Sequence, residues 1–424
     1  MFKALWNRLR STYVDSFLRL SRGFKVVILD GIISRATSPE WFAIYMKDYL
    51  SATNQQIGLY GALSDFFQLV FHLPGGFVGQ RVKNTKVLYL FSIFLSILSY
   101  IVAFFARNWE WLILMSLLGS FWALLSPGID VLIREVTSEV TRALPFKGKA
   151  DFAIQDSVLS TVSMFKSPVI GMFADKFGLR QLFLVSIIGA SVSFTLFLIL
   201  FPKSKGTENR KQEAEKSSEN HKVSFMEVLR MLFRGQTWRA YVGLLLTGTT
   251  WRLFVVGLYP FTTIYLYESI GWTFTFFVFY GLLTSIVILV LRIPAGKLVD
   301  KVGCRPFIFA CMTATSVQWF LMAHVTDMYL VAAVYLTTEI IGIGHNLAVS
   351  KLWFAAIPKE IFPMGSAVRN TFYGITAAFG ALLGAFFWSI LGPQLSFYVM
   401  SSTYLLHAST AAFIIKEPKK TNSS

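Results

Sequence analysis

The chain contains few cysteines and few histidines, and little of it is charged. Its two cysteines, Cys304 and Cys311, have no histidine cluster nearby, so neither a disulfide framework nor a zinc site is indicated. A glycine-rich phosphate-binding loop is also missing, which argues against ATP as an energy source. No Ser/His/Asp set and no pair of histidine ligands falls at a suitable depth. We therefore expect no enzyme, no metal and no cofactor.

Charged residues make up 15% of the chain, whereas 54% of it is hydrophobic and 16% aromatic. A soluble domain has about 25% charged residues. Twelve apolar stretches are long enough for a helix that crosses a bilayer, which needs about 20 residues. The fold class that we predict is an all-α membrane protein with twelve transmembrane helices. The spans are expected near 26–48, 57–79, 87–106, 110–133, 151–173, 181–201, 238–266, 273–296, 306–325, 328–350, 364–391 and 394–415.

The net charge of +16 would suggest nucleic-acid binding in a soluble protein, but its distribution favours a membrane topology. Of the 39 Lys and Arg residues, 31 lie in or at the edges of segments on one side, 4 in loops on the other, and 4 inside spans. Basic residues are retained on the cytoplasmic side during insertion. We expect a multi-pass protein of the plasma membrane, with both termini in the cytoplasm. We also expect a monomer that contacts lipid and no nucleic acid.

The longest polar stretch, 203–222, has no apolar periodicity and is predicted to be a solvated linker. Six spans precede it and six follow it. In residues 1–25, apolar residues at helical spacing alternate with arginines, which indicates an amphipathic helix on the inner leaflet. A partly ordered basic tail is the alternative. The predicted parts are the N-terminal segment 1–25, a bundle 26–201, the linker 202–237, a bundle 238–415 and a tail 416–424.

The two halves resemble each other in sequence. When residues 58–82 are shifted by 220 positions they lie on 278–302, with eight identities and no gap. The identities include a Tyr-Gly pair (60–61 and 280–281) and a Pro-x-Gly triplet (74–76 and 294–296). Shared hydrophobicity does not account for these residues. Duplicated six-helix halves suggest alternating access, in which two bundles move about a central site.

The stretch GKLVDKVGCR at 296–305 resembles the loop signature of the major facilitator superfamily, and GFVGQRVK at 76–83 is its partial counterpart. The resemblance covers essentially all twelve spans. It implies two pseudo-symmetric six-helix bundles that carry out secondary transport by a rocker-switch movement. A third copy, GMFADKFGLR at 171–180, falls on the opposite side of the predicted topology. We interpret it as a close glycine turn without a gating role.

The resemblance also implies gating residues at the cytoplasmic ends of the spans. The glycines at these positions allow close helix contact and a sharp turn. Arg81 is expected to pair with Glu135, and Asp300 with Arg305. In the first half, Gln80 stands where the family signature has an Asp. The ionic contact that closes the cytoplasmic gate is therefore expected to be weaker in this half. Loop charges that merely follow the topology are the alternative. The candidate gating residues are Gly76, Arg81, Glu135, Gly296, Asp300, Gly303 and Arg305.

Two arginines, Arg35 and Arg252, fall near the middle of the first and seventh spans. Charges at this depth are costly and mark pathways. The two spans are equivalent under the repeat, so both side chains can converge on one phosphate or carboxylate. Organophosphate antiporters of the superfamily are similar in placing an arginine on each of these helices. Internal pairing, with Asp30 or Glu40 beside Arg35, is the alternative.

Two carboxyl groups are candidates for proton coupling. Glu339 stands about halfway through the tenth span, and Asp65 lies in the second. Neutral carboxyl groups that bond a neighbouring helix are the alternative reading. Tyr373 and Asn370 share one face of the eleventh span and are further candidates for substrate contact. Together with Arg35 and Arg252, the candidate substrate residues are thus Glu339, Tyr373 and Asn370.

We expect a secondary transporter of a small organic solute, anionic or zwitterionic, coupled to a proton or another ion. Proton-coupled efflux of drugs or lipophilic compounds is one alternative. A protein of another class on the same fold, a membrane sensor or a lipid-handling protein that does not transport, is the second.

Overall fold

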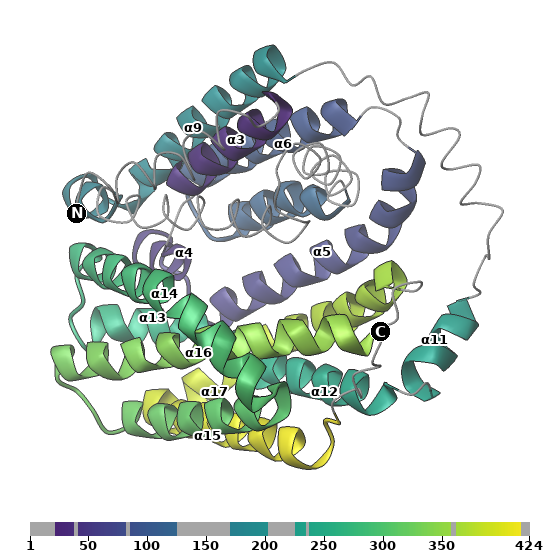
Figure 1. Ribbon diagram of the computed structural model, residues 1–424. Coiled ribbons are helices and arrows are strands. Elements are labelled where there is room, and N and C mark those ends of the chain that lie inside the picture. The colour runs from purple at the N-terminus through teal and green to yellow at the C-terminus, as the bar shows by residue number, and fades with distance from the viewer. Residues whose placement is uncertain are drawn as a thin grey trace, which may run out of the picture. The chain divides into compact units, whose positions relative to one another are not determined.

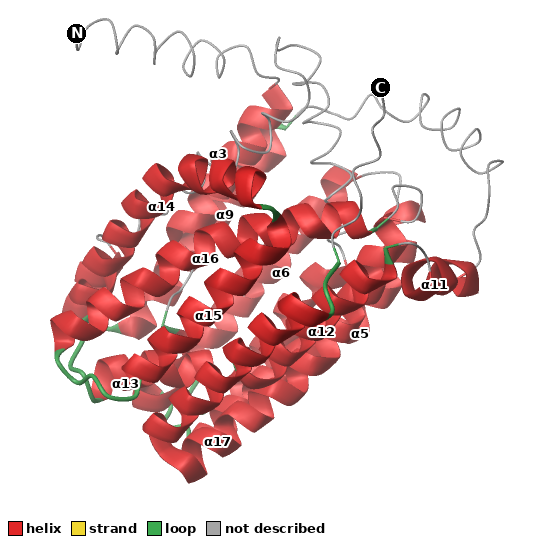
Figure 2. Ribbon diagram, turned by 60° about the horizontal axis from the view of Figure 1, so that its bottom comes forward, coloured by secondary structure: helices red, strands yellow, loops and turns green. Residues whose placement is uncertain are grey.

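The computed structural model describes residues 22–37, 41–81, 85–124, 170–201, 225–234, 237–357 and 362–416. Every regular element in these ranges is helical (Figure 2). The all-α class predicted from the sequence is therefore confirmed. Most of the fifth predicted span and the last part of the fourth, from residue 125 on, fall outside the described residues, so the described part does not establish all twelve crossings.

The labelled helices follow the predicted spans closely in most of the chain (Figure 1). Between them lie two short unlabelled helical stretches, 110–124 and 170–177. The labelled elements are α3 (Arg22–Thr37), α4 (Phe42–Ile44), the π-helical η2 (Tyr45–Tyr49), α5 (Asn54–Arg81), α6 (Thr85–Phe105), α9 (Leu179–Leu200), α11 (Phe225–Arg234), α12 (Trp238–Phe254), the 3₁₀ turn η3 (Val256–Leu258), α13 (Tyr259–Glu268), α14 (Phe274–Val302), α15 (Cys304–Met322), α16 (Met328–Ala356) and α17 (Phe362–Phe413).

Five helical segments of the described chain are long and apolar enough to cross a bilayer: Lys86–Phe105, Leu179–Leu200, Trp238–Glu268, Met328–Trp353 and Val368–Phe413. The last has 46 residues and would be about 69 Å long at 1.5 Å per residue. That is about twice the 30 Å of a hydrocarbon core. Gly392, with φ 72°, and Pro393 interrupt the helix between the predicted eleventh and twelfth spans. The segment is therefore two crossings joined by a tight turn.

The chain groups into two compact units, one of residues 1–40 and 70–213 and the other of residues 41–69 and 214–424. In the first unit, α9 packs against α3 and α6. Its core includes Val26, Tyr89 and Phe197. The buried carboxyl of Asp30 accepts hydrogen bonds from the hydroxyls of Tyr89 and Ser193, so it joins all three helices. The predicted domain boundaries at 26–201 and 238–415 stay a prediction.

The first span, predicted as one helix over 26–48, is interrupted, and that prediction was wrong in this detail. The helix α3 ends at Thr37, and a second helical piece begins at Phe42. Pro39 lies between them in the sequence, and a proline lacks the N–H that would continue a helix. Trp41 then has left-handed backbone angles, φ 56° and ψ 37°. The second piece, α4, belongs to the second unit and contacts α13 of the same unit.

The second unit contains α4, η2, the first part of α5, and α11 to α17. Here α17 packs against α12 and α15, and α16 packs against α14 and α15 (Figures 1 and 2). Two N-caps set the starts of long helices. The Thr273 hydroxyl accepts from the Phe276 amide at 3.1 Å, and Asp327 accepts from the amides of Tyr329 and Leu330. Side-chain oxygens thus satisfy amides that the first turn leaves free.

The seventh span, predicted as one helix over 238–266, is also interrupted, in this case by η3. Pro260 follows directly and cannot donate the backbone bond that a continuous helix requires. At this break, α17 approaches very closely. A Cβ placed on Gly380 would lie 2.2 Å from the Arg252 carbonyl oxygen, and one on Gly384 would lie 2.1 Å from that of Gly257. Gly380 and Gly384, four residues apart, thus let the two backbones come together.

Each half of the chain ties its third helix to its sixth through a basic side chain. Lys86 Nζ, at the start of α6, donates to the carbonyls of Leu198 and Phe201 at 3.1 and 2.9 Å. Arg305, at the start of α15, donates to the carbonyls of Ala411 and Ala412 at the end of α17. A cation at a helix C-terminus satisfies free carbonyls and opposes the helix dipole.

The close contact at Gly380 predicts a large effect of one methyl group. Gly380→Ala should destabilise the protein by about 1–3 kcal/mol, because the new Cβ meets backbone rather than a movable side chain. Gly342→Ala, where no atom lies within 4 Å, is the matched control and should be neutral or raise stability through its better helix propensity. Thermal unfolding in detergent would measure both. Equal melting temperatures for the two variants would contradict the prediction.

Candidate functional site

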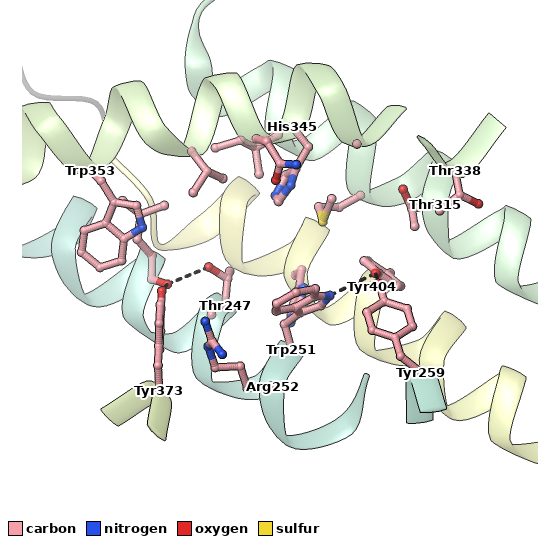
Figure 3. Close-up of a pocket in the computed structure, with 18 of the residues that line it drawn as sticks. Thr247, Trp251, Arg252, Tyr259, Thr315, Thr338, His345, Trp353, Tyr373 and Tyr404 are labelled. Atoms are coloured by element: carbon pink, nitrogen blue, oxygen red, sulfur yellow. Dashed lines mark hydrogen bonds between the residues drawn. The ribbon is translucent and has the colours of Figure 1, made fainter. Parts of the chain in front are cut away.

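A cavity of about 310 Å³ lies among the helices of the second unit (Figure 3). Side chains from α12, α13, α15, α16 and α17 line it. They are Leu244, Thr247, Gly248, Trp251, Arg252, Tyr259, Ile308, Met312, Thr315, Thr338, Glu339, Gly342, His345, Asn346, Val349, Trp353, Tyr373, Tyr404 and His407. Three of the predicted substrate residues, Arg252, Glu339 and Tyr373, are therefore brought to one cavity.

Arg252 lies two residues before the end of α12, where close contact with α17 fixes the backbone. Its guanidinium carbon stands 4.6 Å from the centre of the Tyr373 ring, a cation–π geometry. The Arg252 Nε atom is buried and has no hydrogen-bond partner in the described residues. Asp65 on α5 attracts Arg252 electrostatically, but no ion pair within 4 Å joins these two described residues. The guanidinium thus retains donors for a ligand.

A second group of side chains is held by a short hydrogen-bond chain. Trp251 Nε1 donates to the Tyr404 hydroxyl at 3.0 Å, and the hydroxyls of Tyr404 and Tyr259 lie 3.2 Å apart. Figure 3 shows Tyr259 and Tyr404 on the same side of the cavity as Thr315 and Thr338. Because the bonds fix three aromatic side chains from three helical segments, this wall of the cavity is rigid.

Two histidines extend the polar lining. The His407 Nε2 and Thr250 Oγ1 atoms lie 2.8 Å apart, which positions the His407 ring between α17 and α12. His345 enters from α16 and interacts electrostatically with His407. In the described residues no group of three or more His, Cys, Asp or Glu side chains is suited to a metal ion.

The remaining predicted site residues lie elsewhere. Arg35 is on α3 in the first unit, and its side chain is outside the described part, so its convergence with Arg252 stays a prediction. Asp65 is half-buried on α5 but does not line the cavity. Asn370 is exposed and also absent from the lining. Its Oδ1 accepts from Arg369 Nε at 3.2 Å, while Arg369 stands over the Trp353 ring.

The sequence match to a known family covers residues 26–424. The pattern of the Major Facilitator Superfamily matches residues 26–350 and residues 258–424. The chain belongs to this superfamily. Comparison with curated protein sequences gives no match.

Solved structures of superfamily transporters share the fold. The human organic anion transporter MFSD10 (TETRAN) is 13% identical with a TM-score of 0.61, covering 92% of this chain and 99% of that one. A D323A mutant of the nucleoside transporter NupG is 13% identical with a TM-score of 0.67, covering 93% and 97%. A D-xylose–proton symporter is 12% identical with a TM-score of 0.67, covering 96% and 99%. At these identities the comparisons show the fold and not the substrate.

In the superfamily signature at 296–305 the expected sharp turn is found at Gly303, whereas the close helix contact expected at Gly296 is not found among the described residues. Gly303 has φ 96° and makes the turn from α14 to α15, while Gly296 lies inside α14 with no atom near its Cβ position. Asp300 forms an ion pair with Lys351 of α16, a partner that the sequence did not suggest. Arg305 donates to a carbonyl at the end of α17, and its expected pairing with Asp300 stays a prediction. Asp300 and Arg305 thus connect α14 and α15 to two different helices.

The corresponding gate of the first half is only partly described. Gly76 and Arg81 belong to α5, but their side-chain environment is outside the described part, as is Glu135. The Arg81–Glu135 pair therefore stays a prediction. At the third copy of the signature, Gly178 has φ 85° and separates two helices, in keeping with the interpretation as a close turn.

Several lining residues were missed although the sequence carried a signal for them. On α16, small or polar side chains recur every three or four residues at Thr338, Gly342, His345 and Val349, and Trp353 continues the row. This spacing places them on one helix face. These lining residues were not among the predicted site residues, because all of them except His345 lack an ionisable side chain and so do not stand out in an apolar span.

The position of the cavity predicts that cysteines introduced at different points along α16 will differ in their reactivity toward a thiol reagent. Thr338→Cys should react readily with a small methanethiosulfonate reagent, since Thr338 lines the cavity. Ala348→Cys on the same helix is the matched control and should stay unmodified, because Ala348 is 0% exposed. Both native cysteines are buried, so the background should be low. Mass spectrometry of the labelled protein provides the measurement. Equal labelling at both positions would mean that the cavity is closed to solutes.

Proposed function

We propose that this superfamily member is a secondary active transporter that carries a small organic solute with an anionic group, either an anion or a zwitterion, by rocker-switch alternating access. One observation carries the proposal: Arg252 lines the cavity with a buried Nε that lacks a partner in the described residues. Desolvating a cation is costly unless an opposite charge compensates it. An anionic group of the solute would provide that compensation through hydrogen bonds to the guanidinium.

The surroundings of Arg252 favour this role over a purely structural one. Tyr373 supports the guanidinium from one face, and the backbone contact with Gly380 fixes the base of the side chain. Asp65 attracts it without forming a close ion pair. An anion transporter is among the structural neighbours, although its identity to this chain is low. Arg35 is proposed to complete the anion site from the first half, by the repeat.

Alternating access would be controlled at the signature loops, with Asp300 and Lys351 as one latch. Glu339 and Asp65 remain the proposed groups for proton coupling. The distribution of basic residues supports an orientation with both termini in the cytoplasm, and the plasma membrane is proposed as the site of transport. We further propose that the protein works as a monomer surrounded by lipid, and that it is not an enzyme. Efflux of lipophilic compounds and a non-transporting sensor are the competing functions.

Removal of the guanidinium tests the anion site. Arg252→Ala should weaken binding of an anionic solute by more than tenfold, because a hydrogen bond to a charged group contributes about 1.5–3 kcal/mol. Arg239→Ala is the matched control: Arg239 is on the same helix and stands 5.5 Å over the Trp238 ring, but it is exposed and outside the cavity. A thermal-shift screen of carboxylates and organic phosphates on purified protein would supply the ligand.

Flux into proteoliposomes then separates the functions. Uptake that Arg252→Ala abolishes supports the proposal. Unchanged uptake of anions by this variant would refute it, and transport of lipophilic cations alone would favour the efflux pump. Saturable binding without flux would identify a sensor.

If the Asp300–Lys351 ion pair acts as a latch, its loss should change the transport rate rather than the thermal stability of the protein. Asp300 and Lys351 are 68% and 52% exposed, and an exposed ion pair contributes about 0–1 kcal/mol. Asp300→Lys should therefore change the transport rate several-fold while leaving the melting temperature nearly constant. The double variant with Lys351→Asp restores the pair in reverse and should recover the rate. Lys297→Gln, an exposed change on the same helix, is the control. A failure of the double variant to recover would exclude the latch.

A further inference from the structure

We infer that the cavity selects a zwitterion, whose protonated amine binds Glu339 while its anionic group binds Arg252. The inference rests on the transport function proposed above and adds the substrate class. It depends on three properties of the cavity: the separation of the two charges, the free carboxyl of Glu339, and the aromatic rings around that carboxyl.

The two charged residues belong to different sides of the cavity. In Figure 3, Arg252 lies beside Tyr373 and Trp353, whereas Tyr259 and Tyr404 lie on the other side, near Thr338. Glu339 follows Thr338 on α16. Its carboxyl interacts electrostatically with the hydroxyls of Tyr259 and Tyr404. The cavity therefore has a positive end and a negative end, with Trp251 and His345 between them.

Among the described residues, the carboxyl of Glu339 has no hydrogen-bond or ion-pair partner. Glu339 lines the cavity, is half-buried, and makes neither a hydrogen bond nor an ion pair in the described part of the chain. By contrast, the buried carboxyl of Asp30 is held by two hydroxyl groups. A buried carboxylate without a partner is costly. A protonated amine on the solute would supply both the charge and the hydrogen-bond donors.

The rings around Glu339 suit an ammonium group. Besides Tyr259 and Tyr404, the hydroxyls of Tyr280 and Tyr335 interact electrostatically with this carboxyl. Aromatic faces attract a cation within about 6 Å, and the attraction is larger where water is excluded. The hydrogen bonds of Tyr404 with Trp251 and Tyr259 hold two of these four tyrosine rings in place. A carboxylate set among fixed tyrosines is thus prepared for a cation.

Charge at both ends also explains what the cavity would reject. A simple anion would meet the repulsion of Glu339, and a simple amine that of Arg252. A solute with both charges is favoured at each end. The volume of about 310 Å³ is at the small end of ligand pockets, about 300–1,000 Å³, which suits a molecule the size of an amino acid.

Matched sets of three compounds test the inference. One set is phenylalanine, 3-phenylpropionate and phenethylamine, and the other is leucine, 4-methylpentanoate and 3-methylbutylamine. Calorimetric titration of the purified full-length protein should give, in at least one set, binding of the zwitterion at least tenfold tighter than binding of either partner compound. Glu339→Gln should reduce that preference over the acid by about tenfold or more and leave the acid's own affinity unchanged or higher.

Two further variants guard against a general loss of structure. Glu339→Asp keeps the carboxylate and should retain the preference for the zwitterion at lower affinity. Glu268→Gln removes a carboxylate outside the cavity, one that pairs with Lys47 at 2.6 Å, and should change none of the affinities. Each variant is first compared with the wild type by thermal unfolding.

The possible failures are distinguishable. If neither set shows a preference for the zwitterion, or if Glu339→Gln keeps it, the inference is overturned. If the acids bind as tightly as the zwitterions and Arg252→Ala abolishes both, the inference fails while anion transport stands. If Arg252→Ala leaves the affinity of every acid unchanged, the proposed function itself fails. If Glu339→Gln keeps the preference but removes the response of flux to a pH gradient, Glu339 is a proton site instead.

Discussion

The cost of a charge in an apolar interior governs the arrangement of the second unit. Arg252 is placed two residues before a break in its helix, and the break coincides with the closest backbone approach in this part of the molecule. Gly257, Gly380 and Gly384 make that approach possible. The aromatic ring of Tyr373 then covers one face of the guanidinium. The glycines, the 3₁₀ turn and the tyrosine thus all serve to hold one cation at the wall of a cavity.

Much of the fold could be predicted because the bilayer restricts it so strongly. A helix that satisfies its own backbone bonds is one of two structures that can cross hydrocarbon, so apolar length alone predicted α6, α9, α15 and α16. The junction at Gly392 was likewise evident from composition. The interruptions were not. Pro39 and Pro260 are visible in the sequence, but whether a proline kinks or ends a helix depends on the helices packed against it.

The candidate site was predictable only where a residue was conspicuous. Arg252 and Glu339 were predicted because charged side chains in the middle of a membrane span are rare. Tyr373 was predicted because it shares a helix face with Asn370. Lys351 was not found, because an exposed lysine near a loop resembles every other residue that follows the topology. Asn370 was expected beside Tyr373 on one helix face. In the structure its neighbour Arg369 engages it instead, a contact that spacing does not reveal.

The basic side chains of Lys86 and Arg305 have a mechanical implication. Each binds the last carbonyls of the sixth helix in its own half, so both bonds begin and end inside one half of the chain. A rotation of one half as a whole stretches neither bond. The acidic position of the signature differs between the halves, yet this fastening is present in both. Each half can therefore move as a stiff body without breaking the bonds that join its third and sixth helices.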